Sequence, residues 1–340
     1  MSASAASVPF ALGTFSIAGS PPFPGLVRDD RVLAIRAVDA ICRQVGTELR
    51  QTESLLSLLE YWPDNERALQ RVVAELGAST LFQSVPLSTL KIHAPLEQPR
   101  QIFCSGANYR KHVIDLIVDQ AREPAVQGMT REQRLAYGTR LMDERAAQGT
   151  PYIFSRVWSS ISGPYDPIGL PQDVEQPDWE LELAVIIGRP AYRVTRAAAY
   201  DYIAGYTICN DITNRELVHR QDLKAIGTDW IMGKNLPGYM PMGPFLVPAA
   251  FVKDPQDVRI TLRLNGEVMQ DESTQDMIFD IPRLLEYLTS RVRLWPGDVL
   301  LTGSPSGNGA HFGRFLQPGD IMDGTIAGIG AQRNVCVRAP

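Results

Sequence analysis

The chain has 340 residues, 44% of them hydrophobic and 21% charged, which are ordinary values for a globular protein. Its net charge of −5 argues against a non-specific nucleic-acid surface, and no apolar stretch approaches the length of a membrane-spanning helix. The first residues lack the basic region and apolar core of a signal peptide, and the four cysteines are widely spaced, which fits a reduced compartment. We therefore predict a cytoplasmic protein with no nucleic-acid or membrane partner.

Residues 1–98 are predicted to form a small α/β domain. Two short apolar runs within residues 26–35 flank the charged sequence RDDR, a pattern typical of a β-hairpin. Apolar residues then recur at helical spacing over residues 37–49, 53–61 and 65–76. A proline-containing stretch leads into the rest of the chain, so we predict a second domain over residues 99–340.

Short β-rich runs separated by Gly/Pro turns dominate the chain after residue 100. Helices are predicted only over residues 197–203 and 281–291, and over one long charged stretch, residues 115–150, with a cap region near Thr130. The pattern favours an α+β fold whose main domain is a mixed sheet or roll. The helical insertion is interpreted either as a lid over a site or as a surface or dimer element.

Three carboxylates occur where buried strands are predicted. Glu180 and Glu182 lie two residues apart in DWELELAVIIG, so in a strand they share a face, and Asp211 ends the β-prone run GYTICND. Three carboxylates that meet repel one another unless a cation lies between them. Hard cations such as Mg²⁺, Mn²⁺ and Ca²⁺ prefer ligands of this kind. The alternative is that the glutamates lie on the wet face of an edge strand.

Two further segments carry groups that could take part in chemistry. His112 and Asp115, in SGANYRKHVIDLIVDQ, are three residues apart and would share a helix face; a carboxylate there can orient the imidazole, although an ordinary surface pair is the simpler reading. The loop LTGSPSGNGA offers backbone N–H groups and the Ser304 hydroxyl, which could hold a carboxylate or oxyanion. The alternative is that this loop is only a tight surface turn.

The order of these motifs resembles the fumarylacetoacetate hydrolase family over residues 101–340. The matching series is GxNYxxH, PxxFxR, SGP, DxExE, GYTxxND with Arg215, GK, PMGP, NGE, PGD, TGSPSG, GD and GIG. The resemblance implies a mixed β-roll catalytic domain, preceded by a smaller N-terminal domain and usually found in a homodimer. It also implies a small dicarbonyl substrate.

The family's functional positions map onto this sequence residue by residue. The resemblance implies a Mg²⁺ or Mn²⁺ ion, or Ca²⁺ in a crystal, held by Glu180, Glu182 and Asp211. It implies His112 as general base, and Asp115, Lys234 and Ser304 as further catalytic residues. The remaining implied positions are the substrate contacts Tyr109, Arg215 and Gly303.

The resemblance implies hydrolysis of a C–C bond in a 1,3-diketone or acylpyruvate through an enolate. The alternative on the same site is isomerisation, hydration or decarboxylation of a 2-oxo acid. The chain departs from the family pattern at Val218, Pro237 and Gly238, and Asp115 replaces a more usual glutamate. Losing polar groups at these positions favours a larger, more apolar diketone over a small, highly charged substrate such as oxaloacetate. A catalytically silent metal-binding protein is a third possibility, against which the intact acidic residues and His112 argue.

Overall fold

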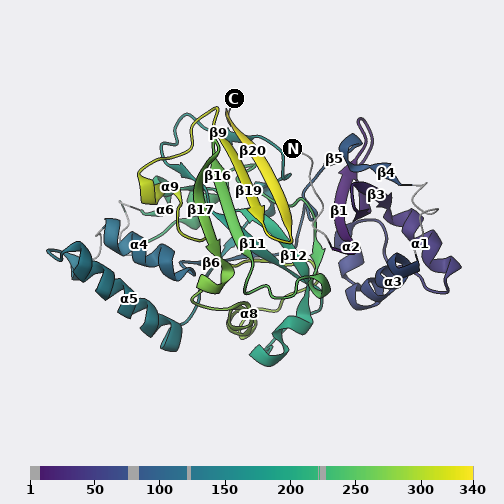
Figure 1. Cartoon of the computed structure of the whole chain (residues 1–340), viewed down its shortest axis with the longest axis horizontal. Coiled ribbons are helices and arrows are strands. Elements are labelled where there is room, and N and C mark those ends of the chain that lie inside the picture. Colours follow the sequence, from purple (N-terminus) through teal and green to yellow (C-terminus); the bar gives the residue numbers. More distant parts are fainter. Residues whose placement is uncertain (1–7, 76–83, 121–123, 221, 223–226, 340) are drawn as a thin grey trace.

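The computed structural model describes residues 8–75, 84–120, 124–220, 222 and 227–339 (Figure 1). The N-terminal part contains a five-stranded antiparallel sheet in the order β4-β3-β2-β1-β5. Its strands are β1 (Ala11–Ser16), β2 (Phe23–Arg28), β3 (Arg31–Ala34), β4 (Val85–Pro86) and β5 (Lys91–Ile92). Strands β2 and β3 pair from Arg28 opposite Arg31, which confirms the predicted hairpin.

Three helices pack with this sheet: α1 (Ile35–Gln44), α2 (Leu55–Leu59) and α3 (Trp62–Glu75). Each coincides with a predicted helix, although α1 begins and ends earlier than expected and α2 is shorter. The predicted end of the third helix, residue 76, lies outside the described residues. Figure 1 shows this part at one end of the molecule, away from α4 and α5.

The rest of the chain is built on two larger sheets, which confirms the predicted mixed α+β fold. The first has the order β15-β12-β11-β18-β6-β7, and only its β18–β6 pair is parallel. Its strands are β6 (Ile102–Gly106), β7 (Tyr152–Arg156), β11 (Leu181–Ile187), β12 (Ile203–Asn210), β15 (Val247–Pro248) and β18 (Val299–Leu301). The second sheet, β17-β16-β19-β20-β9, contains β9 (Ile168–Leu170), β16 (Arg259–Leu264), β17 (Glu267–Ser273), β19 (Ile321–Ile326) and β20 (Gly330–Arg338).

Two short pairs complete the strands. They are β10 (Pro177–Asp178) with β13 (Thr213–Asn214), and β8 (Ile161–Ser162) with β14 (Met240–Pro241). In the sequence, β10 comes shortly before β11 and β13 shortly after β12. The predicted acidic residues lie at these two junctions.

Strand β11 is buried along its whole length because it separates two hydrophobic cores. Leu183 and Val185 belong to the core shared with the second sheet, whereas Ala184 and Ile186 belong to the core shared with the N-terminal helices. A strand covered on both faces is apolar without alternation. This explains the continuous apolar run that follows the two glutamates.

Helices flank these sheets. They are α4 (Arg110–Gln120), α5 (Arg131–Gln148), α6 (Arg215–Val218), α7 (Trp230–Lys234), α8 (Ile281–Thr289) and α9 (Gly309–Phe312). The predicted helix over residues 281–291 is confirmed as α8, and the helix predicted over residues 197–203 is a 3₁₀ helix over residues 196–202. No helix within the described ranges is both long enough and apolar enough to cross a bilayer.

The predicted helical insertion forms two helices that lie against each other, α4 and α5 (Figure 1). Thr130 caps α5: its hydroxyl accepts from the Gln133 N–H, and the Gln133 side chain accepts from the Thr130 N–H. Arg134 Nη1 donates to the Val118 carbonyl at 2.6 Å, which ties α5 to α4. The insertion is therefore a packed helical hairpin.

Candidate metal and acid–base site

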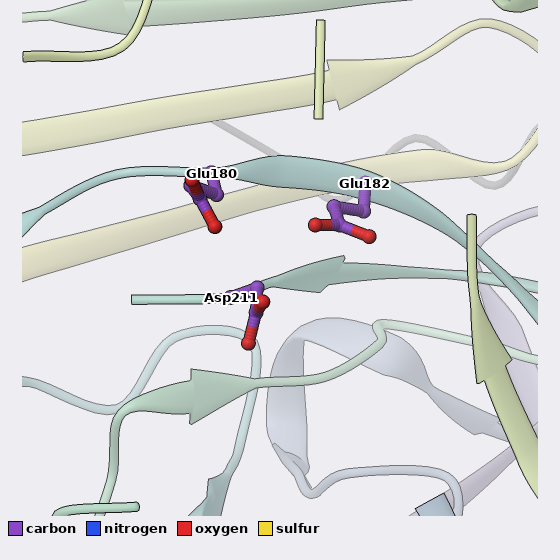
Figure 2. A group of neighbouring side chains, drawn as sticks. All are labelled: Glu180, Glu182 and Asp211. Carbon is purple, nitrogen blue, oxygen red and sulfur yellow. The ribbon is translucent and has the colours of Figure 1, made fainter. Parts of the chain in front are cut away.

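Three buried carboxylates meet where β11 begins and β12 ends. Glu180 precedes β11, Glu182 is its second residue, and Asp211 follows β12. The antiparallel register places Leu181 opposite Asn210, and the Asp211 N–H donates to the Glu180 carbonyl at 2.8 Å. One oxygen of each carboxylate lies within 4.8 Å of the others, and Figure 2 shows all three side chains together. The predicted acidic cluster is confirmed, and its glutamates do not lie on a wet edge.

The protein by itself disfavours the charged form of Glu182. Burial raises its pKa well above the usual value, and the nearby Asp211 and Glu180 raise it further. Its Oε2 accepts the Gly303 N–H at 2.7 Å. Among the described residues, no cationic side chain lies within ion-pair distance of Glu182.

Lys234 bridges the other two carboxylates. Its Nζ lies 2.6 Å from Glu180 Oε2 and also donates to Asp211 Oδ2. Burial acts to lower the pKa of Lys234, but Asp211 and Glu180 raise it above its usual value, so the side chain stays charged. The ammonium also lies 5.3 Å from the ring centre of Phe154 and 5.7 Å from that of Trp230. These two rings are stacked, so an aromatic wall borders the charged cluster.

Two arginines brace the acidic cluster. Arg215 donates from Nε to Asp178 Oδ2 at 2.8 Å and from Nη2 to Glu180 Oε1 at 2.6 Å, while the buried Arg156 pairs with Asp211. Burial raises the pKa of Glu180, but Arg215 and Lys234 outweigh this and hold it well below the usual range. Arg215, predicted to contact substrate, thus binds two acidic side chains of the protein.

The donor set fits a hard divalent cation. Three buried carboxylates from two adjacent strands offer only oxygen ligands, as Mg²⁺ and Mn²⁺ prefer. Glu182 gains the most from such an ion, because it forms no ion pair with a basic side chain of the described residues and the influence of Lys234 is too small to offset its burial. Glu180, Glu182 and Asp211 are therefore the residues that could hold the metal.

His112 lies on α4 and is only 8% exposed. Burial lowers its pKa to about 4; Glu180 partly opposes this shift, and Arg215 adds to it. The imidazole is therefore neutral near pH 7 and able to accept a proton. Glu180 and Arg215 therefore act on this imidazole electrostatically.

Asp115 forms its hydrogen bond with Ser306, while its charge acts on His112 only electrostatically. Its Oδ2 accepts from the Ser306 hydroxyl at 2.6 Å, and no hydrogen bond or ion pair joins it to His112 in the part of the chain that the structure describes. Both side chains lie on one face of α4, as their spacing predicts. That Ser306 faces Asp115 depends on the tertiary fold.

The predicted glycine-rich loop reaches the site from β18. Gly303 has a φ of +99° and gives its N–H to Glu182, while the Ser304 hydroxyl accepts from Gln270 Nε2 at 2.8 Å. Tyr109 is fully buried in the core, so a substrate contact by its hydroxyl would require the side chain to move.

Sequence reasoning assigned no role to Arg156, Asp178 or Gln270. Arg156 is the final residue of the PxxFxR motif and Asp178 the first residue of DxExE. The motifs themselves could therefore have indicated that both residues belong to the site. Asp178 also accepts the Gly309 and Ala310 N–H groups at 2.5 and 3.0 Å. Gln270 lies on β17 of the other sheet and has no sequence signal that links it to Ser304.

Comparisons with known proteins agree with this architecture. The profile of the family described as "Fumarylacetoacetate (FAA) hydrolase C-terminal" matches residues 101–337. "Oxaloacetate tautomerase fahd2, mitochondrial" of Xenopus laevis is 30% identical over 320 residues, 90% of each chain. "Oxaloacetate tautomerase YisK" of Bacillus subtilis is 36% identical over 252 residues, 73% of each chain.

A solved structure resembles the whole chain. The fumarylacetoacetate hydrolase of Exiguobacterium antarcticum superimposes with a TM-score of 0.71 and 28% identity, covering 97% of this chain and 100% of that one. Together with the match over residues 101–337, this similarity establishes that the chain belongs to the fumarylacetoacetate hydrolase family.

Proposed function

We propose that this protein is a divalent-metal-dependent isomerase that interconverts the keto and enol forms of a 2-oxo acid, with oxaloacetate as the first candidate. The observation that carries this proposal is its similarity to two oxaloacetate tautomerases, at 30% and 36% identity over most of both chains. This choice favours the alternative drawn from the sequence over C–C hydrolysis. It also weighs against the inference that the departures at Val218 and Pro237 disfavour oxaloacetate.

The acidic cluster supplies the metal site in this proposal. Glu180, Glu182 and Asp211 would hold Mg²⁺ or Mn²⁺, which when bound supplies Lewis acidity toward adjacent carbonyl and carboxylate oxygens. The fold holds the three carboxylates close together in the protein interior. Arg156 and Arg215 support this by binding Asp211 and Glu180.

His112 is proposed to move the proton. Enolisation breaks a C–H bond next to the ketone and transfers that proton to a base, and the resulting enolate oxygen then takes up a proton from solvent water. The neutral, buried His112 can accept the carbon proton and return it in the reverse direction. Lys234 stays charged while it donates to Glu180 and Asp211, and its positive charge would stabilise the oxyanion electrostatically. The Ser304 hydroxyl, held by Gln270, offers a hydrogen bond.

C–C hydrolysis of an acylpyruvate is the second candidate. The stacked Phe154 and Trp230 beside Lys234, and the buried Val218, give the region an apolar wall that suits a larger acyl arm. The similarity to a fumarylacetoacetate hydrolase points the same way. In this reaction His112 would take a proton from water instead of from carbon.

One assay separates the two reactions. Purified protein with Mg²⁺ or Mn²⁺ is given oxaloacetate in its enol form, with loss of enol absorbance as the readout, and separately an acylpyruvate, with mass spectrometry of the products. Isomerisation conserves the substrate mass, whereas hydrolysis adds one water and yields two fragments. Faster enol decay that is lost in His112→Gln supports the proposal. Acylpyruvate cleavage without tautomerisation would replace it with the second candidate.

We also propose that the protein is a homodimer, as the family resemblance implies. Sedimentation velocity over a range of protein concentrations tests this; a single species with the mass of one chain would contradict it.

A further inference from the structure

One face of α4 is tied at two points to the segment that follows Ser304. His112, Asp115 and Asp119 are spaced i, i+3 and i+7, so they line the same side of the helix. Asp115 Oδ2 accepts from Ser306 Oγ at 2.6 Å, and Asp119 Oδ2 lies 3.0 Å from His311 Nδ1. Figure 1 shows α4, α5 and α9 at the same end of the molecule.

We propose that these two contacts form a clamp, Asp115–Ser306 and Asp119–His311, which positions His112 for its acid–base role. The inference rests on the proposed function, because it takes His112 as the acid–base group. Its four members are positioning residues that act on the reaction through His112.

The inner contact is the more sheltered of the two. Ser306 is 8% exposed, and Asp115 lies one helical turn from His112. The outer pair is partly open to solvent, with 26% of the His311 side chain and 30% of the Asp119 side chain exposed. A buried hydrogen bond to a charged group contributes more than a partly exposed close contact that makes no hydrogen bond, such as that of His311 Nδ1 with Asp119. Loss of Ser306 is therefore expected to matter more than loss of His311.

The same segment is also tied to the acidic cluster. Asp178 accepts the Gly309 and Ala310 N–H groups and binds Arg215, which in turn binds Glu180. Residues 306–311 thus hold α4 on one side and the metal-ligand candidates on the other. The position of His112 relative to Glu180 follows from this common support.

Other contacts also hold α4: the Lys111 N–H donates to Asp276 at 2.9 Å, the Lys111 ammonium lies 3.3 Å from Glu272, Asp119 also pairs with Arg131 at 3.6 Å, and Ile114 and Val118 pack in the core. At its N-terminal end the Asn108 amide donates to the Phe279 and Thr302 carbonyls, which fixes where the helix begins. At its C-terminal end Arg134 ties it to α5, which belongs to the same helical hairpin. Only the side-chain clamp described here joins the face that carries His112 to the segment after Ser304, among the residues whose placement the structure gives.

The test uses Ser306→Ala, His311→Asn and the double variant, with Ser306→Thr as the conservative rescue. A displacement of about 1 Å at a reacting group can cost on the order of 100-fold in rate. We expect kcat to fall about tenfold in Ser306→Ala, less in His311→Asn, and about 100-fold in the double variant. KM and Mn²⁺ affinity should stay at wild-type values, and Ser306→Thr should restore kcat.

Asp143→Asn is the matched control. It removes the 2.5 Å pair between Asp143 and Arg110, which joins α4 to α5 but not to the segment after Ser304. This variant should keep the wild-type kcat. Unchanged kcat in the double clamp variant would overturn the proposal, as would a loss confined to KM or Mn²⁺ affinity.

Amide hydrogen exchange separates failure of the clamp from failure of the proposed function. Exchange along α4 should be faster in the double variant than in wild type and Asp143→Asn, whatever the reaction is. Unchanged exchange overturns the clamp. A protein that shows faster exchange but turns over no 2-oxo acid would retain the clamp and lose the proposed function.

Discussion

Lys234 Nζ lies 2.6 Å from Glu180 Oε2, so a buried cation of the protein already occupies one side of the proposed metal site. The same ammonium donates to Asp211, which leaves Glu182 as the carboxylate without a basic partner among the described side chains. The protein thus compensates part of the negative charge by itself and leaves the rest to the metal. The expected consequences differ for Lys234 and Glu182.

Lys234→Met should destabilise the metal-free protein by about 3–5 kcal/mol, because it leaves two buried carboxylates without their shared cation. Adding Mn²⁺ should raise the melting temperature of this variant more than that of wild type, since the ion restores the missing positive charge. Thermal melts with and without Mn²⁺ measure both effects. Lys91→Met, which removes an exposed pair with Asp166, is the control and should cost less than about 1 kcal/mol. Equal Mn²⁺ responses in Lys234→Met and wild type would contradict the account.

Glu182→Gln should have the opposite effect on the metal-free protein. The raised pKa of Glu182 means that folding disfavours its charged form, so a neutral amide should leave stability unchanged or increase it at pH 7. Mn²⁺ affinity should fall at least about 100-fold. Even residues that only hydrogen-bond to a metal ligand typically lower metal affinity by roughly 10–100-fold when they are mutated. Calorimetric titration and urea unfolding in EDTA provide the two readouts, with the exposed Glu267→Gln as control. A destabilised Glu182→Gln variant that binds Mn²⁺ normally would argue for a purely structural carboxylate.

His112 predicts a specific loss of stability in acid. Its pKa is about 4 in the folded protein and near 6.5 when unfolded, so the unfolded chain binds the proton more tightly. Stability from this group is complete above pH 6.5 and is lost as the pH falls toward 4, by about 3 kcal/mol.

The difference between wild type and His112→Gln isolates this effect from other groups. Unfolding free energies of both proteins in EDTA, measured from pH 7 to pH 4, should converge or cross as the pH falls. A constant difference over this range would show that His112 titrates normally and is not buried as described.

Gly303→Ala should be costlier than an ordinary glycine replacement. The backbone has a φ of +99°, and an added Cβ would lie 3.0 Å from Asn108 Cβ and 3.1 Å from the Ser105 carbonyl oxygen. We expect a loss of about 2–3 kcal/mol and weaker Mn²⁺ binding, because the Gly303 N–H would move away from Glu182.

Gly46→Ala is the matched control for that variant. Gly46 also has a positive φ, +73°, but no atom lies within 4 Å of an added Cβ, so only the backbone penalty of about 1 kcal/mol applies. The free energy of unfolding of both variants is measured by urea unfolding. Similar losses in the two would show that contacts of the added Cβ at Gly303 do not contribute.

Much of the site was predictable because its ligands sit in locally regular segments. The two-residue spacing of Glu180 and Glu182 decides that they share a strand face, and the helical spacing of His112 and Asp115 decides that they share a helix face. The continuous apolar run after Glu182 correctly indicated a buried strand. The domain boundary near residue 98 and the roles of the individual site residues stay predictions.

The sequence by itself determined which residues can meet along one element, together with the motif order that identifies the family. Only the tertiary structure decided which elements face one another. It placed Lys234 between Glu180 and Asp211, gave Arg215 to Asp178 and Glu180, and paired Asp115 with Ser306 instead of His112. The physical reason is that spacing along the chain fixes the side of a strand or helix to which a side chain points. Contacts between residues that are 23 to 191 positions apart depend instead on how the sheets and loops pack.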